Sequence, residues 1–238
     1  MSVKQSLYYN GTILTMEGHT PQYAEAVLVE NGVILAVGER SVLRQDLHLG
    51  ARQIDLKQGT MLPGLIELYS DRIKQLCRHM DGQKRISMKE IRSRLCGVSE
   101  CMDSYARRGY TTVVETGCTE KEWQLLKLAG ILGKLKPDVV CDYKGSTAKR
   151  GYCMHVRTSG YMRPKERQTS TSPYEFLLER TIEAAYRICE EEHKGSIQAG
   201  KDADFVIVEV NPLQMTQLRW DELPVRETIK ADKTIWKM

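Results

Sequence analysis

The sequence predicts an α/β protein whose two ends are rich in strands and whose middle alternates helices with strands. Three observations support this fold class. An Asn-Gly turn lies between two apolar runs near the start, capping-box motifs precede the expected helices, and apolar β-type runs return after residue 195. Because helix–strand–helix–strand order favours parallel pairing, we expect a parallel sheet in the centre of the chain.

The N-terminal region predicts a β-hairpin. Asn31-Gly32 lies between the apolar runs 26–30 and 33–38. Both central residues of a type I′ turn need positive φ, which Asn and Gly tolerate best. The other expected elements of this region are strands at 7–16, 52–56 and 61–68 and a short helix within 40–49.

Helices in the middle of the chain are predicted from their first turns. In a capping box, a Ser or Thr side chain and a Glu three residues later satisfy the first free N–H groups of a helix. Three such motifs occur, at 87–90, 119–122 and 172–175. Buried strands are expected at 111–115, 138–142 and 205–208, and the runs 225–229 and 234–236 are expected to pair with each other. The polar stretches 72–87 and 143–171 show no period and are expected to be loops.

Composition excludes several classes of protein. The 238 residues, 41% of them hydrophobic, can bury the core of one large domain or two small ones. The net charge of +4 is spread without a basic run, so no nucleic-acid partner is expected. The start lacks an apolar signal-peptide core and no stretch approaches the ~20 apolar residues of a membrane span, so we expect a cytoplasmic protein without a membrane partner. The scattered cysteines and histidines form no ready-made metal motif.

Two segments near opposite ends of the chain carry the strongest functional signal. The first, residues 62–67, reads LPGLIE, and the second, residues 194–208, reads KGSIQAGKDADFVIV. Together they resemble the metal-dependent amidohydrolase superfamily, most closely amidohydrolase family 3. In that family the Pro-Gly run begins the first barrel strand, which delivers a His-x-His pair to a catalytic metal. The matching positions here are Tyr69, Ser70 and Asp71.

The resemblance implies a small composite β-sandwich, formed by residues 6–60 and 192–238, beside a truncated (β/α) barrel at 61–191. A complete barrel takes ~250 residues, about twice what this central segment offers. Only three barrel-like strands are expected, at 61–68, 111–115 and 138–142. Since three strands cannot close a barrel, the expected barrel is reduced and incomplete.

The resemblance also implies a chemistry, the hydrolysis of carbon–nitrogen bonds other than peptide bonds by a water molecule bound to zinc or another divalent metal. Asp71 and His155 are the candidate metal ligands in this chain. A tyrosine and one carboxylate are poor substitutes for two imidazoles, so we expect a degraded site that has lost its metal. No catalytic residue can be assigned.

Three further residues match the family pattern loosely. His79 could contribute to a metal site, and Lys144 could be a carboxylated bridging lysine of the family type. A solvated loop lysine is the simpler interpretation of Lys144. Glu67 matches the acidic residue after the Pro-Gly run, and a structural role in hydrogen bonding to the backbone explains it equally well.

Two hypotheses therefore stay open. In the first, the protein is a hydrolase of a small molecule that completes its metal site with Asp71, with His79 or His155, and with a second subunit of a homo-oligomer. In the second, it is a non-catalytic regulatory or interaction protein derived from the family. The metal content of the folded protein distinguishes them.

Overall fold

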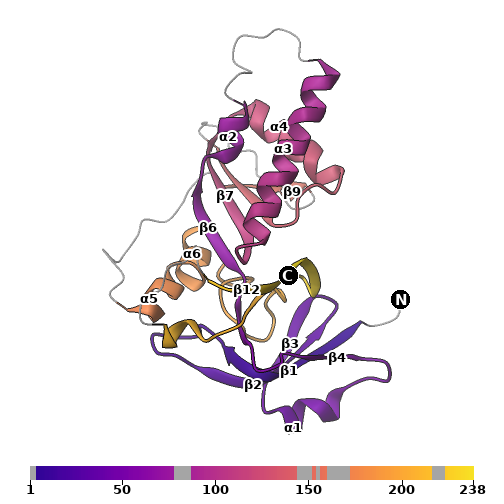
Figure 1. The fold of residues 1–238 in the computed structure, drawn as a ribbon, viewed down its shortest axis with the longest axis vertical. Helices are drawn as coiled ribbons and strands as arrows, with labels where there is room; N and C mark the ends of the chain where they lie inside the picture. Colours follow the sequence, from indigo (N-terminus) through magenta and orange to yellow (C-terminus); the bar gives the residue numbers. More distant parts are fainter. Residues whose placement is uncertain (1–3, 78–86, 144–151, 154–155, 160–171, 216–222) are drawn as a thin grey trace.

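The computed structural model describes residues 4–77, 87–143, 152–153, 156–159, 172–215 and 223–238 (Figure 1). Within these residues the strands form two hydrogen-bonded sheets, one in the lower and one in the upper part of Figure 1. The described helices include none that is long and apolar enough to cross a membrane.

The first sheet combines strands from both ends of the chain. Its order is β13-β12-β11-β5-β1-β2-β3, and β4 pairs with β1 beside this path. The N-terminal strands are β1 (Gln5–Leu14), β2 (Tyr23–Glu30), β3 (Val33–Gly38), β4 (Arg52–Asp55) and β5 (Thr60–Pro63), and the C-terminal strands are β11 (Phe205–Val208), β12 (Val225–Lys230) and β13 (Lys233–Lys237). The two termini are joined where β5 and β11 pair in antiparallel orientation.

The predicted hairpin is present. Strands β2 and β3 pair in antiparallel orientation, and the turn residues Asn31 and Gly32 have φ values of 51° and 86°. Positive φ at both positions is what a type I′ turn requires. After β3 the short helix α1 (Arg40–Leu43) continues into a 3₁₀ helix, residues 44–46.

The second sheet lies in the middle of the chain. In the described residues its order is β6-β7-β8-β10-β9, and the first four strands run parallel. These strands are β6 (Leu65–Ser70), β7 (Tyr110–Cys118), β8 (Asp138–Tyr143), β10 (Val156–Ser159) and the antiparallel β9 (Tyr152–Cys153). The two outer strands of this order, β6 and β9, do not pair with each other in the described residues, so no closed barrel is found there.

Helices cover both faces of the second sheet. Its helices are α2 (Arg72–Cys77), α3 (Met88–Ala106), α4 (Glu120–Ile131), α5 (Pro173–Leu178) and α6 (Ile182–Arg187). One face packs on α3 and α4 through a core that includes Val98, Val113 and Val139. On the other face, Val114 and Val140 pack against α6. Both apolar faces of this largely parallel sheet are therefore covered by helices, as parallel sheets require.

All three capping boxes are present. Ser87, Thr119 and Ser172 each accept a hydrogen bond from the N–H group three residues later, and the glutamate at that position accepts one in return. The helix predicted after Ser172 is divided, because α5 ends at Leu178 and α6 begins only at Ile182.

Two of the loop predictions were wrong in part. The stretch predicted as a loop from 72 to 87 contains α2, and the stretch from 143 to 171 contains β9 and β10. In both cases the stabilising partner is distant in the sequence. Strand β10, for example, forms along β8, with Val156 opposite Val139. A local polar pattern cannot reveal such a partner.

The strand predicted at 61–68 is divided between the two sheets at Gly64. Thr60–Pro63 pairs in the first sheet and Leu65–Ser70 in the second, so the first sheet extends past the predicted boundary at residue 60. A Cβ atom on Gly64 would lie 2.2 Å from Thr111 Oγ1. The glycine of the Pro-Gly motif is therefore required by the close approach of β7. Whether the two sheets are separate domains stays a prediction.

A buried ion network connects the two sheets. The carboxylate of Asp204 lies 2.9 Å from Lys194 Nζ and 3.1 Å from Lys230 Nζ, and both lysines also reach Asp138 at the start of β8, at 3.0 and 2.8 Å. Lys194 and Asp204 belong to the family-like C-terminal segment. Their role here is to fix the C-terminal strands to the central sheet.

Candidate functional site

The positions that match the family's His-x-His pair lie at the carboxyl end of β6. Tyr69 is 61% exposed, and the Arg187 guanidinium of α6 lies 5.2 Å from the centre of its ring. This distance is within the range of a cation–π interaction. The side chain at the first ligand position of the family is thus engaged with a helix that packs beside the strand.

Ser70 takes part in a buried hydrogen-bond network. Its hydroxyl donates to Glu115 of β7 at 2.6 Å and accepts from Tyr105 Oη of α3 at 3.0 Å. The other oxygen of Glu115 accepts the N–H groups of Ile73 and Lys74, at 2.9 and 3.1 Å. The carboxylate of Glu115 thereby accepts N–H groups of the first turn of α2 that have no acceptor within the helix.

Burial raises the pKa of Glu115, although the hydrogen bonds from Ser70, Lys74 and Ile73 oppose the increase. Desolvation disfavours the charged form of a carboxyl group, whereas hydrogen bonds donated to it favour that form. Glu115 is therefore a buried structural acid, with its oxygens already used by donors from β6 and α2.

Asp71, the predicted metal ligand, lies on the surface before α2. Its carboxylate accepts a hydrogen bond from Gln75 Nε2 at 2.8 Å, and its carbonyl accepts the Gln75 N–H at 2.9 Å. The second predicted ligand, His155, lies outside the described residues, as do His79 and Lys144. The structure therefore does not test whether Asp71 and these histidines come together.

Two thiols occupy the corresponding ends of the next strands. Cys118 ends β7 and Cys141 lies near the end of β8, and both are buried. The hydrogen bond between them raises the pKa of Cys118, and burial raises it further.

The described residues at the end of β6 do not fit the metal centre that the family uses. Among the described residues, no group of three or more His, Cys, Asp or Glu side chains is close enough to hold a metal ion. At the three positions of the His-x-His motif, Tyr69 contacts Arg187, Ser70 is hydrogen-bonded to Glu115, and Asp71 is hydrogen-bonded to Gln75. A catalytic zinc site needs three protein ligands around one point. We derive no metal-bound step from this arrangement.

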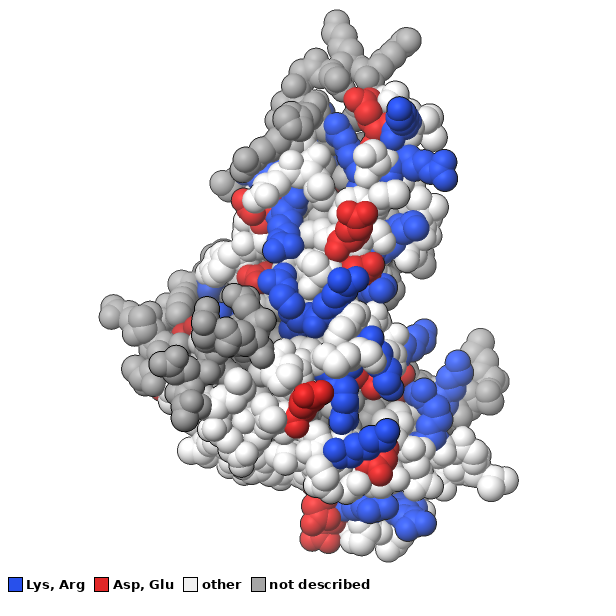
Figure 2. All heavy atoms as spheres, viewed as in Figure 1, with Lys and Arg blue, Asp and Glu red and all other residues white. Residues whose placement is uncertain are grey.

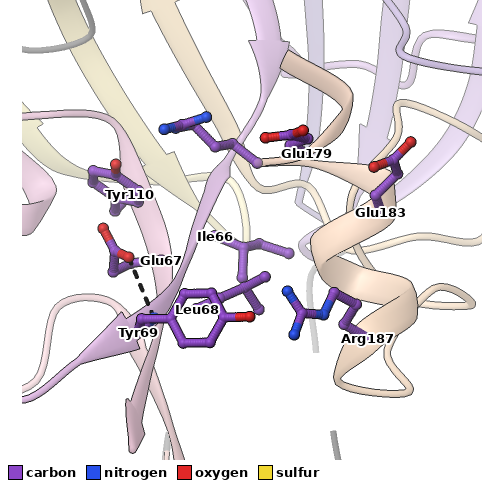
Figure 3. Close-up of a pocket in the computed structure, with 9 residues that line it drawn as sticks. Ile66, Glu67, Leu68, Tyr69, Tyr110, Glu179, Glu183 and Arg187 are labelled. Carbon is purple, nitrogen blue, oxygen red and sulfur yellow. Dashed lines mark hydrogen bonds between the residues drawn. The ribbon is translucent and has the colours of Figure 1, made fainter. Parts of the chain in front are cut away.

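A pocket of about 160 Å³ lies along the open edge of β6. Its lining residues come from β6, from the start of β7 and from the segment that holds α5 and α6: Ile66, Glu67, Leu68, Tyr69, Tyr110, Glu179, Arg180, Glu183 and Arg187. Figure 3 shows Glu67 and Tyr110 on the strand side and Arg187 on the helix side, with Leu68 between them. The Ile66 N–H donates to the Arg180 carbonyl at 2.8 Å, which holds the turn between α5 and α6 against the strand.

Charged and phenolic groups give this pocket its chemical character. Burial raises the pKa of Tyr110 to about 12, with a smaller contribution from Glu67, so this phenol stays protonated and can donate a hydrogen bond. Arg180 lies 3.7 Å from the centre of the Phe176 ring and hydrogen-bonds to Tyr110, which lowers the pKa of Tyr110 slightly. Sequence reasoning assigned no site role to the residues of α5 and α6 in this pocket, because only the fold brings these helices beside β6.

The surface seen in Figure 2 carries basic and acidic side chains side by side over both sheets. The pocket likewise combines carboxylates with guanidinium groups.

Comparison with known proteins agrees with the resemblance seen in the sequence. The Amidohydrolase family model matches residues 152–236. No match was found among the curated proteins. Among solved structures, guanine deaminase from E. coli is 11% identical and has a TM-score of 0.69, with 100% of both chains covered. An adenosine deaminase from Xanthomonas campestris with bound zinc is 13% identical and has a TM-score of 0.59, with 97% of this chain and 92% of that chain covered.

A further amidohydrolase structure is 13% identical, with a TM-score of 0.68 over 99% of this chain and 100% of that chain. At such identities the solved structures show a common fold and do not show a common substrate. A complete (β/α) barrel alone takes ~250 residues, so a chain of 238 residues is short for this fold. The family match over residues 152–236 and the shared fold confirm the resemblance to the amidohydrolase superfamily that the sequence indicated.

Proposed function

We propose that this protein derives from amidohydrolases that hydrolyse carbon–nitrogen bonds other than peptide bonds, that its metal site is degraded, and that it acts by binding and not by hydrolysis. The family match and the fold support the descent from hydrolases. The proposal of a binding role rests on the described residues at the carboxyl ends of the strands.

One observation carries the proposal. The three positions that match the family's His-x-His motif are occupied by Tyr69, Ser70 and Asp71, and each makes an interaction within the fold. Restoring a metal site would require Asp71 to leave Gln75 and at least two further ligands to approach it. The hydrogen bonds of Ser70 and Glu115 already use these side chains within the fold, which supports the proposal.

The similar structures show what the ancestral fold can do. They include a guanine deaminase and an adenosine deaminase with bound zinc, and both names describe cleavage of a carbon–nitrogen bond. A relative that had kept this chemistry would need zinc or a similar ion to activate water. The predicted loss of the metal is therefore the feature to test first.

The test is the metal content of the folded protein. Purified protein, prepared without chelator and then incubated with zinc, would be desalted and analysed by mass spectrometry for zinc, iron, manganese and cobalt. We expect well below one metal ion per chain, together with a cooperative thermal transition. We also expect no ammonia release from guanine or adenosine above that of the buffer with zinc.

Asp71→Ala and Asp46→Ala form a matched pair of variants. Both residues are exposed. Asp46 lies in the 3₁₀ helix between β3 and β4, in a different part of the chain from the carboxyl end of β6. We expect both variants to match the parent in metal content. One zinc per chain that is lost in Asp71→Ala and kept in Asp46→Ala would overturn the proposal and restore the metal-dependent hydrolase.

A further inference from the structure

The end of helix α4, in the upper part of Figure 1, carries apolar side chains on its solvent side. Leu128, Ile131 and Leu132 are 36%, 55% and 52% exposed. Their spacing of three and four residues places them on one side of the helix. The opposite side of α4 is buried in the core through Leu125 and Ala129. The helix end is thus apolar on both sides, whereas the solvent side of a surface helix is normally polar.

The way in which the helix ends fixes the position of these side chains. Leu132 is the C-cap, and Gly133 follows it with a φ of 65°. The Gly133 N–H donates to the Gly130 carbonyl at 3.0 Å, and the Lys134 N–H donates to the Ala129 carbonyl at 2.8 Å. These two hydrogen bonds form a Schellman motif, which satisfies carbonyl groups at the end of the helix. The exposed apolar side chains therefore lie on a regular, hydrogen-bonded helix end.

Lysine side chains flank this apolar surface. Lys127 lies in the last turns of α4, Lys134 follows the helix end, and both lysines are exposed. Residues 123–137 contain no aspartate or glutamate. The third lysine of this stretch, Lys136, pairs with Asp103 of α3 at 2.9 Å, so its charge is already balanced. Lys127 and Lys134 thus give the surroundings of the apolar side chains a positive charge.

We propose that the end of α4 docks on a lipid surface with anionic headgroups. In this contact Leu128, Ile131 and Leu132 enter the boundary between headgroups and acyl chains, and Lys127 and Lys134 lie at the level of the headgroups. Amphipathic helices bind membrane surfaces by this combination of apolar burial and attraction to anionic lipids. The expectation of no membrane partner rested on the lack of a spanning stretch, and a surface contact needs none.

Two properties favour a lipid surface over another protein. The apolar side chains project from a convex helix end, and a fluid lipid surface adapts to such a shape, whereas a protein would need a matching groove. A second copy of this chain would bring the same two lysines to the contact, because an isologous interface presents the same surface on both subunits. Like charges oppose such an association, whereas anionic headgroups meet the lysines with the opposite charge.

The contact is small, so the binding is expected to be weak and reversible. Three partly exposed side chains offer less apolar surface than a single myristoyl chain, which alone binds membranes with a constant of about 10⁴ M⁻¹. Millimolar lipid is therefore needed to detect the bound fraction. Salt screens the attraction between the lysines and the headgroups, so the binding should weaken as the ionic strength rises.

The experiment is sedimentation of the full chain with sucrose-loaded vesicles at millimolar lipid. One set of vesicles contains phosphatidylcholine and phosphatidylserine at a ratio of about 7:3, and the other contains phosphatidylcholine alone. We expect the apparent binding constant to be about tenfold or more higher for the mixed vesicles, and the difference to shrink in high salt. No sedimentation with the mixed vesicles, or equal sedimentation with both sets, would overturn the proposal.

Two double variants connect the binding to α4. Ile131→Ser with Leu132→Ser removes apolar side chains, and Lys127→Gln with Lys134→Gln removes charges. Each double variant is expected to weaken binding to the mixed vesicles about tenfold or more. All four positions are exposed, so both proteins should keep the cooperative thermal transition of the parent.

The matched controls change exposed residues outside α4. Leu35→Ser with Leu49→Ser removes two exposed apolar side chains, and Lys57→Gln with Lys233→Gln removes two exposed charges. Both controls should bind the mixed vesicles like the parent. Unchanged binding in the α4 variants, or an equal loss in the controls, would contradict the assigned surface.

Light scattering on the same proteins tests whether a second copy covers this surface instead. A dimer that is lost in Ile131→Ser with Leu132→Ser, in a parent that does not bind vesicles, would overturn the proposal in favour of self-association. The end of α4 shares no residue with the positions of the His-x-His motif, so the vesicle result is independent of the metal content. One zinc ion per chain bound through Asp71 would overturn the proposed function and leave the lipid contact untouched.

Discussion

Replacing Asp204 by Asn is expected to destabilise the protein strongly, because it removes one charge from a buried ion network. The Asp204 side chain is 5% exposed, and it lies 2.9 and 3.1 Å from the ammonium groups of Lys194 and Lys230. It also accepts the Ala231 N–H at 2.9 Å. The asparagine keeps the size of the side chain but removes its charge, which leaves Asp138 as the main counter-ion of two buried lysines.

The magnitude follows from the burial of the network. Removing one partner of a buried ion pair typically costs about 3–5 kcal/mol, because an uncompensated charge stays buried. For a chain of this size each kcal/mol lowers the melting temperature by roughly 2–4 °C, so Asp204→Asn should lower it by about 6–20 °C. Glu100→Gln, at an exposed position of α3, is the matched change from acid to amide and should cost less than about 0.5 kcal/mol.

The dependence on pH gives a second readout. Burial tends to raise the pKa of Asp204, but Lys194 and Lys230 outweigh it and lower this pKa. Its contribution to stability is therefore present above the pKa of the unfolded chain and is lost as the pH falls through the lower folded value. The difference between parent and Asp204→Asn should be largest near neutral pH and should shrink in acid.

The measurement is urea unfolding followed by circular dichroism, at neutral pH and at several acid values. A loss below about 1 kcal/mol for Asp204→Asn at neutral pH would refute the reasoning. So would a loss that stays constant down to the acid transition. Adding Lys230→Met to Asp204→Asn should recover part of the lost stability, because one of the uncompensated charges is removed.

Three other changes test the strand ends and the local motifs. Gly64→Ala would place a Cβ atom 2.2 Å from Thr111 Oγ1 and should cost about 1–3 kcal/mol or more in urea unfolding, whereas Gly38→Ala has open space and should be nearly neutral. Burial raises the pKa of Glu115, so the folded protein holds the carboxyl proton more tightly than the unfolded chain does. The parent should therefore lose stability relative to Glu115→Gln as the pH rises from about 4.5 through that raised pKa. A parallel pH dependence of the two proteins would contradict this. Ser87→Ala removes one half of a capping box and should cost about 1 kcal/mol, measured as a shift in the urea midpoint; a shift of zero would show that α3 does not need its cap.

Local signals predicted the elements that depend on few neighbouring residues. The hairpin at Asn31-Gly32 and the three helix starts follow from backbone conformation and from hydrogen bonds that span three residues. The Pro-Gly motif similarly marked the start of the first central strand. These interactions form between residues that are close in the sequence, so a local sequence pattern is enough to predict them.

Elements that depend on distant partners were missed for the opposite reason. Helix α2 begins where Glu115, from the neighbouring strand, accepts the N–H groups of Ile73 and Lys74. Neither the composition of α2 nor the spacing of its apolar residues indicates this partner. The pocket is a similar case, since its walls are brought together by the turn at Arg180, which is hydrogen-bonded to Ile66.

The packing of α6 bears both on the second sheet and on the residues at the positions of the family's His-x-His motif. A metal site of the family type needs side chains that converge from strands around a closed ring, and the described strands of the second sheet do not form one. Helix α6 covers one face of the described sheet, with Ala184, Ala185 and the following Ile188 packed on it. This packing brings Arg187 over Tyr69, at the position where the family has its first histidine. The same helix therefore covers one face of the sheet and places a guanidinium beside position 69, so a histidine introduced there alone would meet Arg187.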